Sequence, residues 1–124
     1  MEKETILLVE DEPTLLELLK SVFEDEGYRV VTAGDGEEAV EIFRKKENEV
    51  RVVLTDMGLP KLGGWEMFER IRVIDPHAKV ILASGFVDAE MRSEAMRRGA
   101  KDFIQKPYIP AAILKRIRDV LDSA

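Results

Sequence analysis

Four apolar runs in this sequence end in side chains that can carry chemistry. The first leads into Glu10 and Asp11, and the others lead to Asp56, Ser84 and Lys106. A carboxylate can act as a nucleophile and form an acyl phosphate. Clustered carboxylate oxygens are also hard ligands of the kind that Mg2+ prefers. The residue types therefore indicate phosphoryl transfer, metal binding, or both.

The elements that must position these side chains follow a repeated pattern. Five short apolar runs, at residues 6–9, 29–32, 52–55, 80–83 and 103–104, alternate with five stretches of helical periodicity. The runs are mostly continuous, which is typical of strands buried on both faces of a parallel sheet. The alternation predicts an α/β fold with helices on both faces. The carboxyl ends of such strands share one edge, where the binding crevice lies, so the reactive side chains should converge there.

Helix start and stop signals frame the helical stretches. We expect Gly27 and Gly99 to follow the first and fourth helices, and Pro110 to open the fifth. The core face of the first helix is expected to hold Leu15, Leu18, Leu19, Val22 and Phe23.

Leu16 lies at the margin of that stripe, close to the acidic pair. With Leu15 it is expected to form part of an exposed patch for a histidine-bearing helical partner. Simple core packing is the alternative.

The electrostatics of the expected site call for a cation. Glu10, Asp11 and Asp56 together bring about −3, and Lys106 returns about +1. A single Mg2+ would balance the remainder and tolerates bound water and phosphate oxygens. Zinc is disfavoured, because the chain has no cysteine and one histidine, His77. The twelve-residue loop of a helix-loop-helix calcium site is absent.

Composition limits the function class. A chain of 124 residues with 45% hydrophobic residues is expected to form one domain, residues 1–124. The net charge of −6 disfavours general nucleic-acid binding, although residues 92–118 carry eight basic and two acidic side chains, a local charge of +6. No apolar run reaches the length of a membrane span and no basic signal-peptide start is present, which fits a cytoplasmic protein without membrane contact.

The motifs resemble one known family. Residues 6–12 (ILLVEDE), 54–60 (LTDMGLP) with Gly63 and Gly64, 81–85 (ILASG) and 99–107 (GAKDFIQKP) are similar to the receiver domain of two-component response regulators. The resemblance covers essentially the whole chain. It implies a flavodoxin-like, doubly wound (βα)5 fold with strand order 2-1-3-4-5. Residues 54–68 and 84–108 are especially similar to receivers of hybrid sensor histidine kinases.

This resemblance implies a signalling phosphoacceptor that catalyses only its own phosphorylation and dephosphorylation. Asp56 would accept the phosphoryl group from a histidine kinase or a histidine phosphotransfer domain. Asp11 would bind Mg2+ directly, Glu10 would serve the same metal site, and the backbone carbonyl of Gly58 would be a further ligand.

The resemblance also implies a switch. Ser84 and Lys106 would hold the phosphoryl group, and Phe103 would occupy the aromatic switch position. A movement of Ser84 toward the phosphoryl group would leave a gap that Phe103 swings inward to fill. The fourth helix, fifth strand and fifth helix would shift, and we expect an acidic or mixed-charge effector, or a second copy of the domain, to bind there.

Other classes remain as alternatives. A phosphatase or phosphotransferase of the haloacid dehalogenase type also uses a nucleophilic Asp, but it needs a second Asp where this chain has Gly58. A phosphorylation-independent module on the same fold would usually lack one of the site residues. A DNA-binding regulator would need an attached output domain, and a nucleotide-binding protein would need a phosphate-cradling glycine-rich loop.

Overall fold

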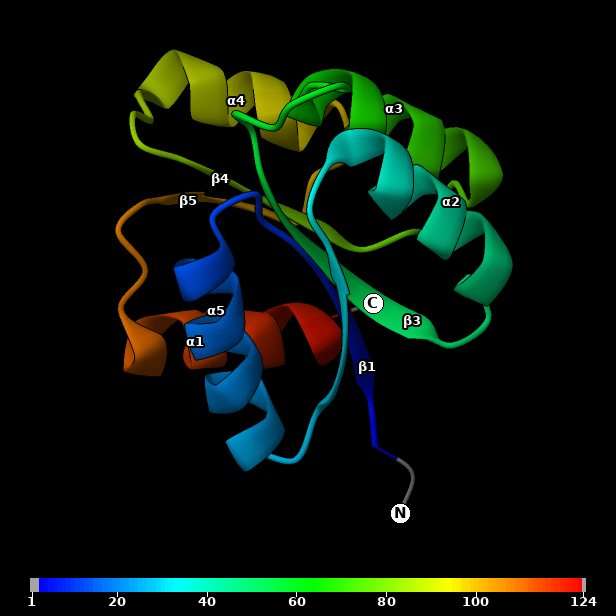
Figure 1. The fold of residues 1–124 in the computed structure, drawn as a ribbon. Helices are drawn as coiled ribbons and strands as arrows, with labels where there is room; N and C mark the ends of the chain where they lie inside the picture. Colours follow the sequence, from blue (N-terminus) through cyan, green and yellow to red (C-terminus); the bar gives the residue numbers. More distant parts are fainter. Residues whose placement is uncertain (1–2, 124) are drawn as a thin grey trace.

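The computed structural model describes residues 3–123, which form one parallel sheet flanked by helices (Figure 1). The strands are β1 (Thr5–Val9), β2 (Arg29–Ala33), β3 (Val50–Asp56), β4 (Val80–Ser84) and β5 (Asp102–Gln105). The helices are α1 (Pro13–Asp25), α2 (Gly36–Lys46), α3 (Gly64–Ile74), α4 (Ala89–Arg97) and α5 (Pro110–Leu121). The strand order is β2-β1-β3-β4-β5, so the predicted flavodoxin-like fold is confirmed.

Two hydrophobic layers hold the helices against the sheet. Figure 1 shows α2, α3 and α4 on one face, and α1 and α5 on the other. Successive strand residues point to opposite faces. Leu7 of β1 packs in the layer that contains Phe43 and Phe68, whereas Leu8 packs in the layer that contains Phe23 and Ile117. Burial on both faces explains why β1, β3 and β4 have continuous apolar sequences, whereas the edge strand β2 is only partly buried.

The helix ends follow the local signals in the sequence. The side chain of Asp35 accepts a hydrogen bond from the backbone N–H of Glu38 at 2.8 Å and caps α2. Pro110 opens α5 as predicted. Gly27 and Gly99 follow α1 and α4 with φ of +95° and +105°, a conformation that glycine adopts without steric cost. Local sequence thus determines where these helices begin and end.

The apolar face of α1 is rotated from the predicted one. Leu18 is 56% exposed, whereas Leu15 and Leu16 are partly buried against the core. Relative to the buried Leu19, Leu16 is about 60° away around the helix and Leu18 about 100° away. The expectation that Leu18 lies in the core is therefore wrong. The exposed leucine of this helix is Leu18 rather than the predicted pair, Leu15 and Leu16.

On α4, Met96 is 41% exposed while its neighbour Ala95 is fully buried. None of the helices within residues 3–123 combines the length and the apolar character needed to cross a membrane.

The start of α3 packs directly on the backbone that follows β3. The N–H of Gly64 donates to the carbonyl oxygen of Met57 at 3.1 Å. A Cβ on Gly64 would lie 2.7 Å from the Met57 Cα and 2.8 Å from its Sδ. The neighbouring Gly63 has no atom within 4 Å of the equivalent position. The absence of a side chain at Gly64 therefore lets α3 approach the segment that carries Asp56.

We expect Gly64→Ala to lower the free energy of unfolding by about 1–3 kcal/mol, because overpacking must displace the Met57 backbone. Gly63→Ser is the matched control, since it adds a Cβ in open space and supplies a favourable helix cap. Urea denaturation of both variants measures the difference. Equal stability of Gly64→Ala and the wild type would contradict the close approach.

Candidate functional site

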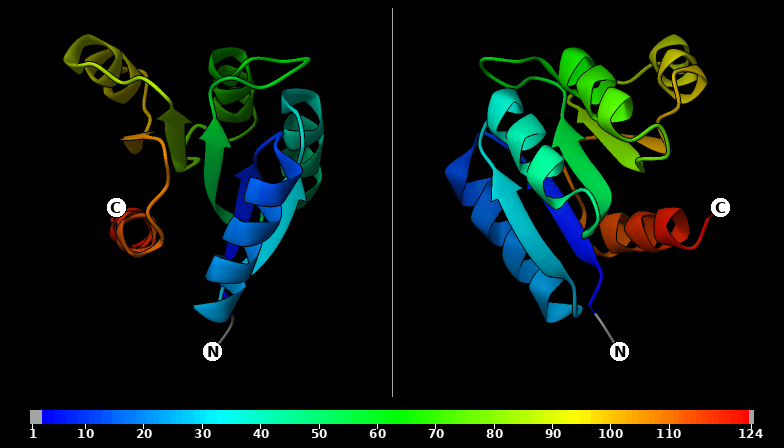
Figure 2. Two further views of the ribbon diagram at one scale, coloured as in Figure 1. Left: turned by 60° about the vertical axis from the view of Figure 1, so that its left-hand side comes forward. Right: turned by 90° about the vertical axis from the view of Figure 1, so that its right-hand side faces the viewer.

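The parallel strands end along one edge of the sheet (Figure 2), and the predicted site residues lie at or just after these strand ends. Glu10 follows β1, Asp56 ends β3, and Ser84 ends β4. Lys106 follows β5, and its backbone N–H donates to the Ser84 carbonyl oxygen at 2.8 Å. Residues that are far apart in sequence are therefore brought together by strand order alone.

Three carboxylates form the acidic part of the site. One oxygen each from Glu10, Asp11 and Asp56 lies within 4.8 Å of the others. The ammonium nitrogen of Lys106 lies 3.1 Å from Glu10 Oε1 and 3.5 Å from Asp56 Oδ2. The predicted convergence of these four residues is present in the structure.

The three carboxylates differ in their exposure to solvent. The side chain of Glu10 is 2% exposed and that of Asp56 is 13% exposed, whereas Asp11 is an exposed residue. Asp56 combines a nearby ammonium with some access to solvent. Glu10 has the ammonium but is enclosed, and no ion pair joins Asp11 to Lys106 among residues 3–123.

Burial and charge raise the pKa values of both Glu10 and Lys106, but for different reasons. Burial raises the pKa of Glu10, although the Lys106 ammonium and the Glu12 backbone N–H, at 3.2 Å, favour the charged form. Burial alone would lower the pKa of Lys106, but the hydrogen bond to Glu10 and the charges of Asp56 and Glu10 raise it. The ammonium therefore stays charged beside a carboxyl group for which ionisation is costly.

The oxygens fit a small hard cation. Two oxygens on opposite sides of one Mg2+ are about 4.2 Å apart. Small side-chain movements would bring Glu10, Asp11 and Asp56 to that spacing. A Cβ on Gly58 would lie 3.8 Å from Asp56 Oδ2, so Gly58 leaves the space beside Asp56 free of a side chain. The contribution of its carbonyl group stays a prediction.

The Ser84 hydroxyl is engaged locally. Its oxygen accepts a hydrogen bond from the Phe86 N–H at 3.3 Å. Among the described residues, no hydrogen bond joins this hydroxyl to Asp56 or Lys106. Because the hydroxyl is an acceptor here, its own proton remains available for another oxygen.

Phe103 is already inside the protein. Its side chain is 1% exposed and meets the Trp65 ring edge-on, with the centroids 6.5 Å apart. The predicted inward swing has no outward starting position in this conformation. A phenylalanine has no hydroxyl that would favour a surface position, so burial dominates.

Two neighbours of the site were missed from the sequence. The ring of Tyr108 lies 5.6 Å from the Lys106 ammonium, and burial raises the pKa of its hydroxyl. Lys106 and Pro107 form a bend after the end of β5, so the alternation of side chains along a strand does not predict this contact. Asp102, counted only as a charge, is 8% exposed and pairs with Arg92 and Arg116 at 3.1 Å and 3.0 Å.

The basic stretch at residues 92–118 is largely neutralised by pairing. Ion pairs are formed by Arg92, Arg97, Arg98, Lys106, Lys115, Arg116 and Arg118. The surface is therefore one of mixed charge rather than a free basic patch.

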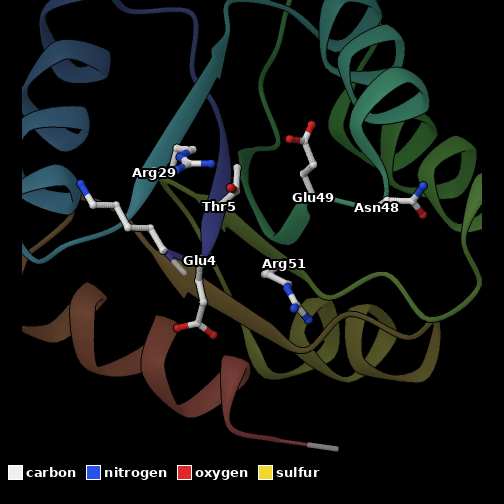
Figure 3. Close-up of a pocket in the computed structure, with 7 residues that line it drawn as sticks. Glu4, Thr5, Arg29, Asn48, Glu49 and Arg51 are labelled. Carbon is white, nitrogen blue, oxygen red and sulfur yellow. The ribbon is translucent and has the colours of Figure 1, made fainter. Parts of the chain in front are cut away.

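A separate polar pocket lies at the opposite edge of the sheet (Figure 3). It has a volume of about 300 Å3 and is lined by residues at the starts of β1, β2 and β3, including Thr5, Arg29 and Arg51. None of its lining residues belongs to the carboxylate site. The candidate chemistry therefore stays at the carboxyl edge.

Comparison with known proteins gives a consistent result. A family model described as "Response regulator receiver domain" matches residues 6–118. The chemotaxis protein CheY of Thermotoga maritima is 35% identical over 116 residues, which cover 93% of this chain and 95% of that protein. The probable transcriptional regulator ycf27 of Porphyridium aerugineum is 37% identical over 121 residues, which cover 98% of this chain and 49% of that protein.

The chain thus spans about half the length of the ycf27 regulators that it matches, at 49% and 46%. Among solved structures, the CheX-CheY-BeF3-Mg+2 complex from Borrelia burgdorferi matches with a TM-score of 0.92 and 30% identity. That match covers 97% of this chain and 90% of the other chain.

The raised pKa of Glu10 has a consequence for stability in metal-free buffer. The folded chain keeps this proton to a higher pH than the unfolded chain does. The group therefore favours folding below its ordinary pKa and disfavours it progressively as the pH rises above that value. Glu10→Gln removes this dependence and keeps an oxygen for Lys106. We expect the variant to gain stability relative to wild type as the pH rises above the ordinary pKa of a glutamate.

Urea denaturation in the presence of a chelator at several pH values measures this difference. Glu12→Gln is the matched control, because Glu12 is exposed and contributes only its backbone to the site. Parallel stability curves for Glu10→Gln and the wild type would mean that burial of Glu10 has no cost.

Proposed function

This chain belongs to the response regulator receiver family, and we propose that it signals by accepting a phosphoryl group on Asp56. Receivers of this family are the phosphoacceptors of two-component systems. The observation that carries the assignment is the distinct position of Asp56. Its carboxylate lies 3.5 Å from the Lys106 ammonium, beside Glu10 and Asp11, and is 13% exposed, whereas the Glu10 side chain is 2% exposed.

The transfer is a substitution at phosphorus. A carboxylate oxygen of Asp56 attacks the phosphorus atom of the donor, and a new O–P bond forms. The bond from phosphorus to the donor nitrogen or oxygen breaks, and its electron pair leaves with the donor. A carboxylate needs no general base for this step, so catalysis rests on positioning and on compensation of charge.

The neighbouring groups have complementary roles. Lys106 presents a fixed positive charge to the phosphoryl oxygens. Ser84 donates its free hydroxyl proton to one of those oxygens, a charge-assisted hydrogen bond. This arrangement compensates the charge on two different oxygens of the phosphoryl group.

Glu10, Asp11 and Asp56 would hold Mg2+ together with the carbonyl oxygen of Gly58. The bound ion would neutralise charge on the transferring oxygens. The oxygen donor set and its spacing support this assignment. The related CheY from Borrelia burgdorferi, solved in a complex with BeF3 and Mg+2, supports it as well.

The chain acts on itself rather than on a separate substrate. Gly58 stands where a haloacid dehalogenase-type enzyme has the second Asp that handles the leaving group, so no second acid is supplied. The whole protein is either a single receiver or a larger regulator or hybrid histidine kinase. Relatives of both kinds match this chain, since the match covers about half of the ycf27 regulators but 95% of the Thermotoga maritima CheY.

Two surfaces are available to protein partners. The exposed Leu18 on α1 is an apolar contact point for a histidine kinase or a histidine phosphotransfer domain. The surface formed by α4, β5 and α5 consists of paired charges, including Arg92 and Arg116 around Asp102. A mixed-charge effector or a second copy of the domain fits such a surface better than a purely acidic partner does.

We expect acetyl phosphate with Mg2+ to add one phosphoryl group to the wild-type chain, measured by intact-mass spectrometry. Asp56→Asn should abolish the addition because the amide is not a nucleophile. Asp25→Asn is the matched control, since Asp25 is an exposed residue at the end of α1. Undiminished addition to Asp56→Asn would refute the assignment.

Phosphorylation should also change amide hydrogen exchange in α4, β5 and α5. Movement of Ser84 toward the phosphoryl group alters β4, which pairs with β5 from Leu82 to Phe103. In Ser84→Ala the change should be confined to the loops around Asp56. If phosphorylation changes hydrogen exchange in α4 as much in Ser84→Ala as in the wild type, the Ser84 hydroxyl does not couple Asp56 to this surface.

A further inference from the structure

A hollow of about 380 Å3 lies along α4 beside Trp65, which is the second residue of α3. Figure 1 shows α3 and α4 side by side on the same face of the sheet. The apolar part of the hollow consists of Trp65 and Met91, which are both partly buried. Its polar residues include Asp88, Glu90, Glu94 and Arg97. The volume is within the range of small ligand sites and accommodates a few side chains.

The charge of the hollow favours a cation. Three carboxylates face one guanidinium, and two of the carboxylates already have partners. Asp88 caps α4 through the Met91 N–H at 2.8 Å, and Glu94 pairs with Arg97 and Arg98. Glu90 is exposed and has no ion pair within residues 3–123. It is therefore the carboxylate most available to an incoming cation.

Trp65 already binds a guanidinium on one side. The Cζ atom of Arg98 lies 4.7 Å from the centroid of the Trp65 ring, a cation–π contact. Arg98 is held in place by ion pairs to Glu69 at 2.9 Å and Glu94 at 3.2 Å. Arg98 thus already supplies the cation on Trp65, so the ring offers apolar contact to the hollow.

We propose that this hollow, formed by Trp65, Met91, Asp88, Glu90, Glu94 and Arg97, binds a protein segment with alternating basic and aliphatic side chains. The aliphatic side chain packs on Trp65 and Met91, and the basic side chain pairs with Glu90. The net negative charge of the hollow selects this occupant over an acidic segment. Arg97 on the rim competes with the incoming cation for Glu94.

Occupancy of the hollow has a route to the phosphorylation site. Trp65 contacts Phe103 of β5, and Phe103 pairs with Leu82, two residues before Ser84. This link rests on the proposed function, whereas binding of the segment does not. If phosphorylation alters affinity for the segment, the segment alters phosphorylation equilibrium by the same factor.

The chain has a single tryptophan, so fluorescence of Trp65 reports binding directly. The probe is the peptide acetyl-Arg-Leu-Arg-Leu-amide, titrated into unphosphorylated protein at low salt. We expect a saturable change, with affinity that falls as salt is added. Glu90→Lys should weaken binding by at least about fivefold, and Arg97→Ser should strengthen it by about twofold to threefold. Glu24→Lys, which makes the same charge change on α1, should leave binding unchanged.

Two control peptides separate charge from apolar contact. Acetyl-Glu-Leu-Glu-Leu-amide and acetyl-Arg-Ser-Arg-Ser-amide should each bind more weakly than the probe. The proposal is overturned by a non-saturable response, by equal binding of the acidic peptide, or by equal effects of Glu90→Lys and Glu24→Lys. It is also overturned if Trp65 fluorescence changes with protein concentration in the absence of peptide and ultracentrifugation detects dimers. The occupant of the hollow is then a second copy of the chain. The same titration with Asp56→Asn keeps this test independent of phosphorylation.

Discussion

Three carboxylates and one ammonium meet at the carboxyl edge of the sheet, and the proposed chemistry of this protein depends on that excess of negative charge. Lys106 extends from the end of β5 past β4 to Glu10 and Asp56. Its positive charge compensates only part of the negative charge, so the site is an electrostatically costly arrangement in the absence of a cation. A bound cation would lower this electrostatic cost and so stabilise the folded site. The same site is also suited to a ligand that brings oxygen atoms and a cation together.

The sheet is what makes the imbalance possible. The strands on either side of Asp56, β1 and β4, are buried on both faces, which fixes the backbone positions from which the site residues extend. On the helical side, Gly64 lets α3 pack against the segment after Asp56. Asp102 of β5, the strand that carries Phe103, forms ion pairs with Arg92 of α4 and with Arg116 of α5. A displacement of β5 therefore reaches both helices through the same carboxylate.

The sequence predicts well that the site residues converge at the carboxyl edge of the sheet. Polar residues at strand ends and a βα repeat are both local patterns, and together they place these residues at the same edge. The prediction fails where the answer depends on tertiary packing. Leu16 and Leu18 have the same type, and only the contact of α1 with the sheet decides which of them is buried. From the sequence alone, the local charge of +6 at residues 92–118 also suggests a free basic surface, because the ion pairs that neutralise it depend on the fold. Arg118 pairs with Glu4, which is 114 positions away, and no periodicity can predict that contact.

Isothermal titration calorimetry of Mg2+ binding tests the central claim most directly. The account predicts one ion per wild-type chain, a strong loss of affinity in Asp11→Asn, and a smaller loss in Glu10→Gln. Glu24→Gln, on the exposed surface of α1, should bind as the wild type does. Absence of binding to the wild type, or unchanged affinity in Asp11→Asn, would contradict the conclusion that this carboxylate cluster is a cation site.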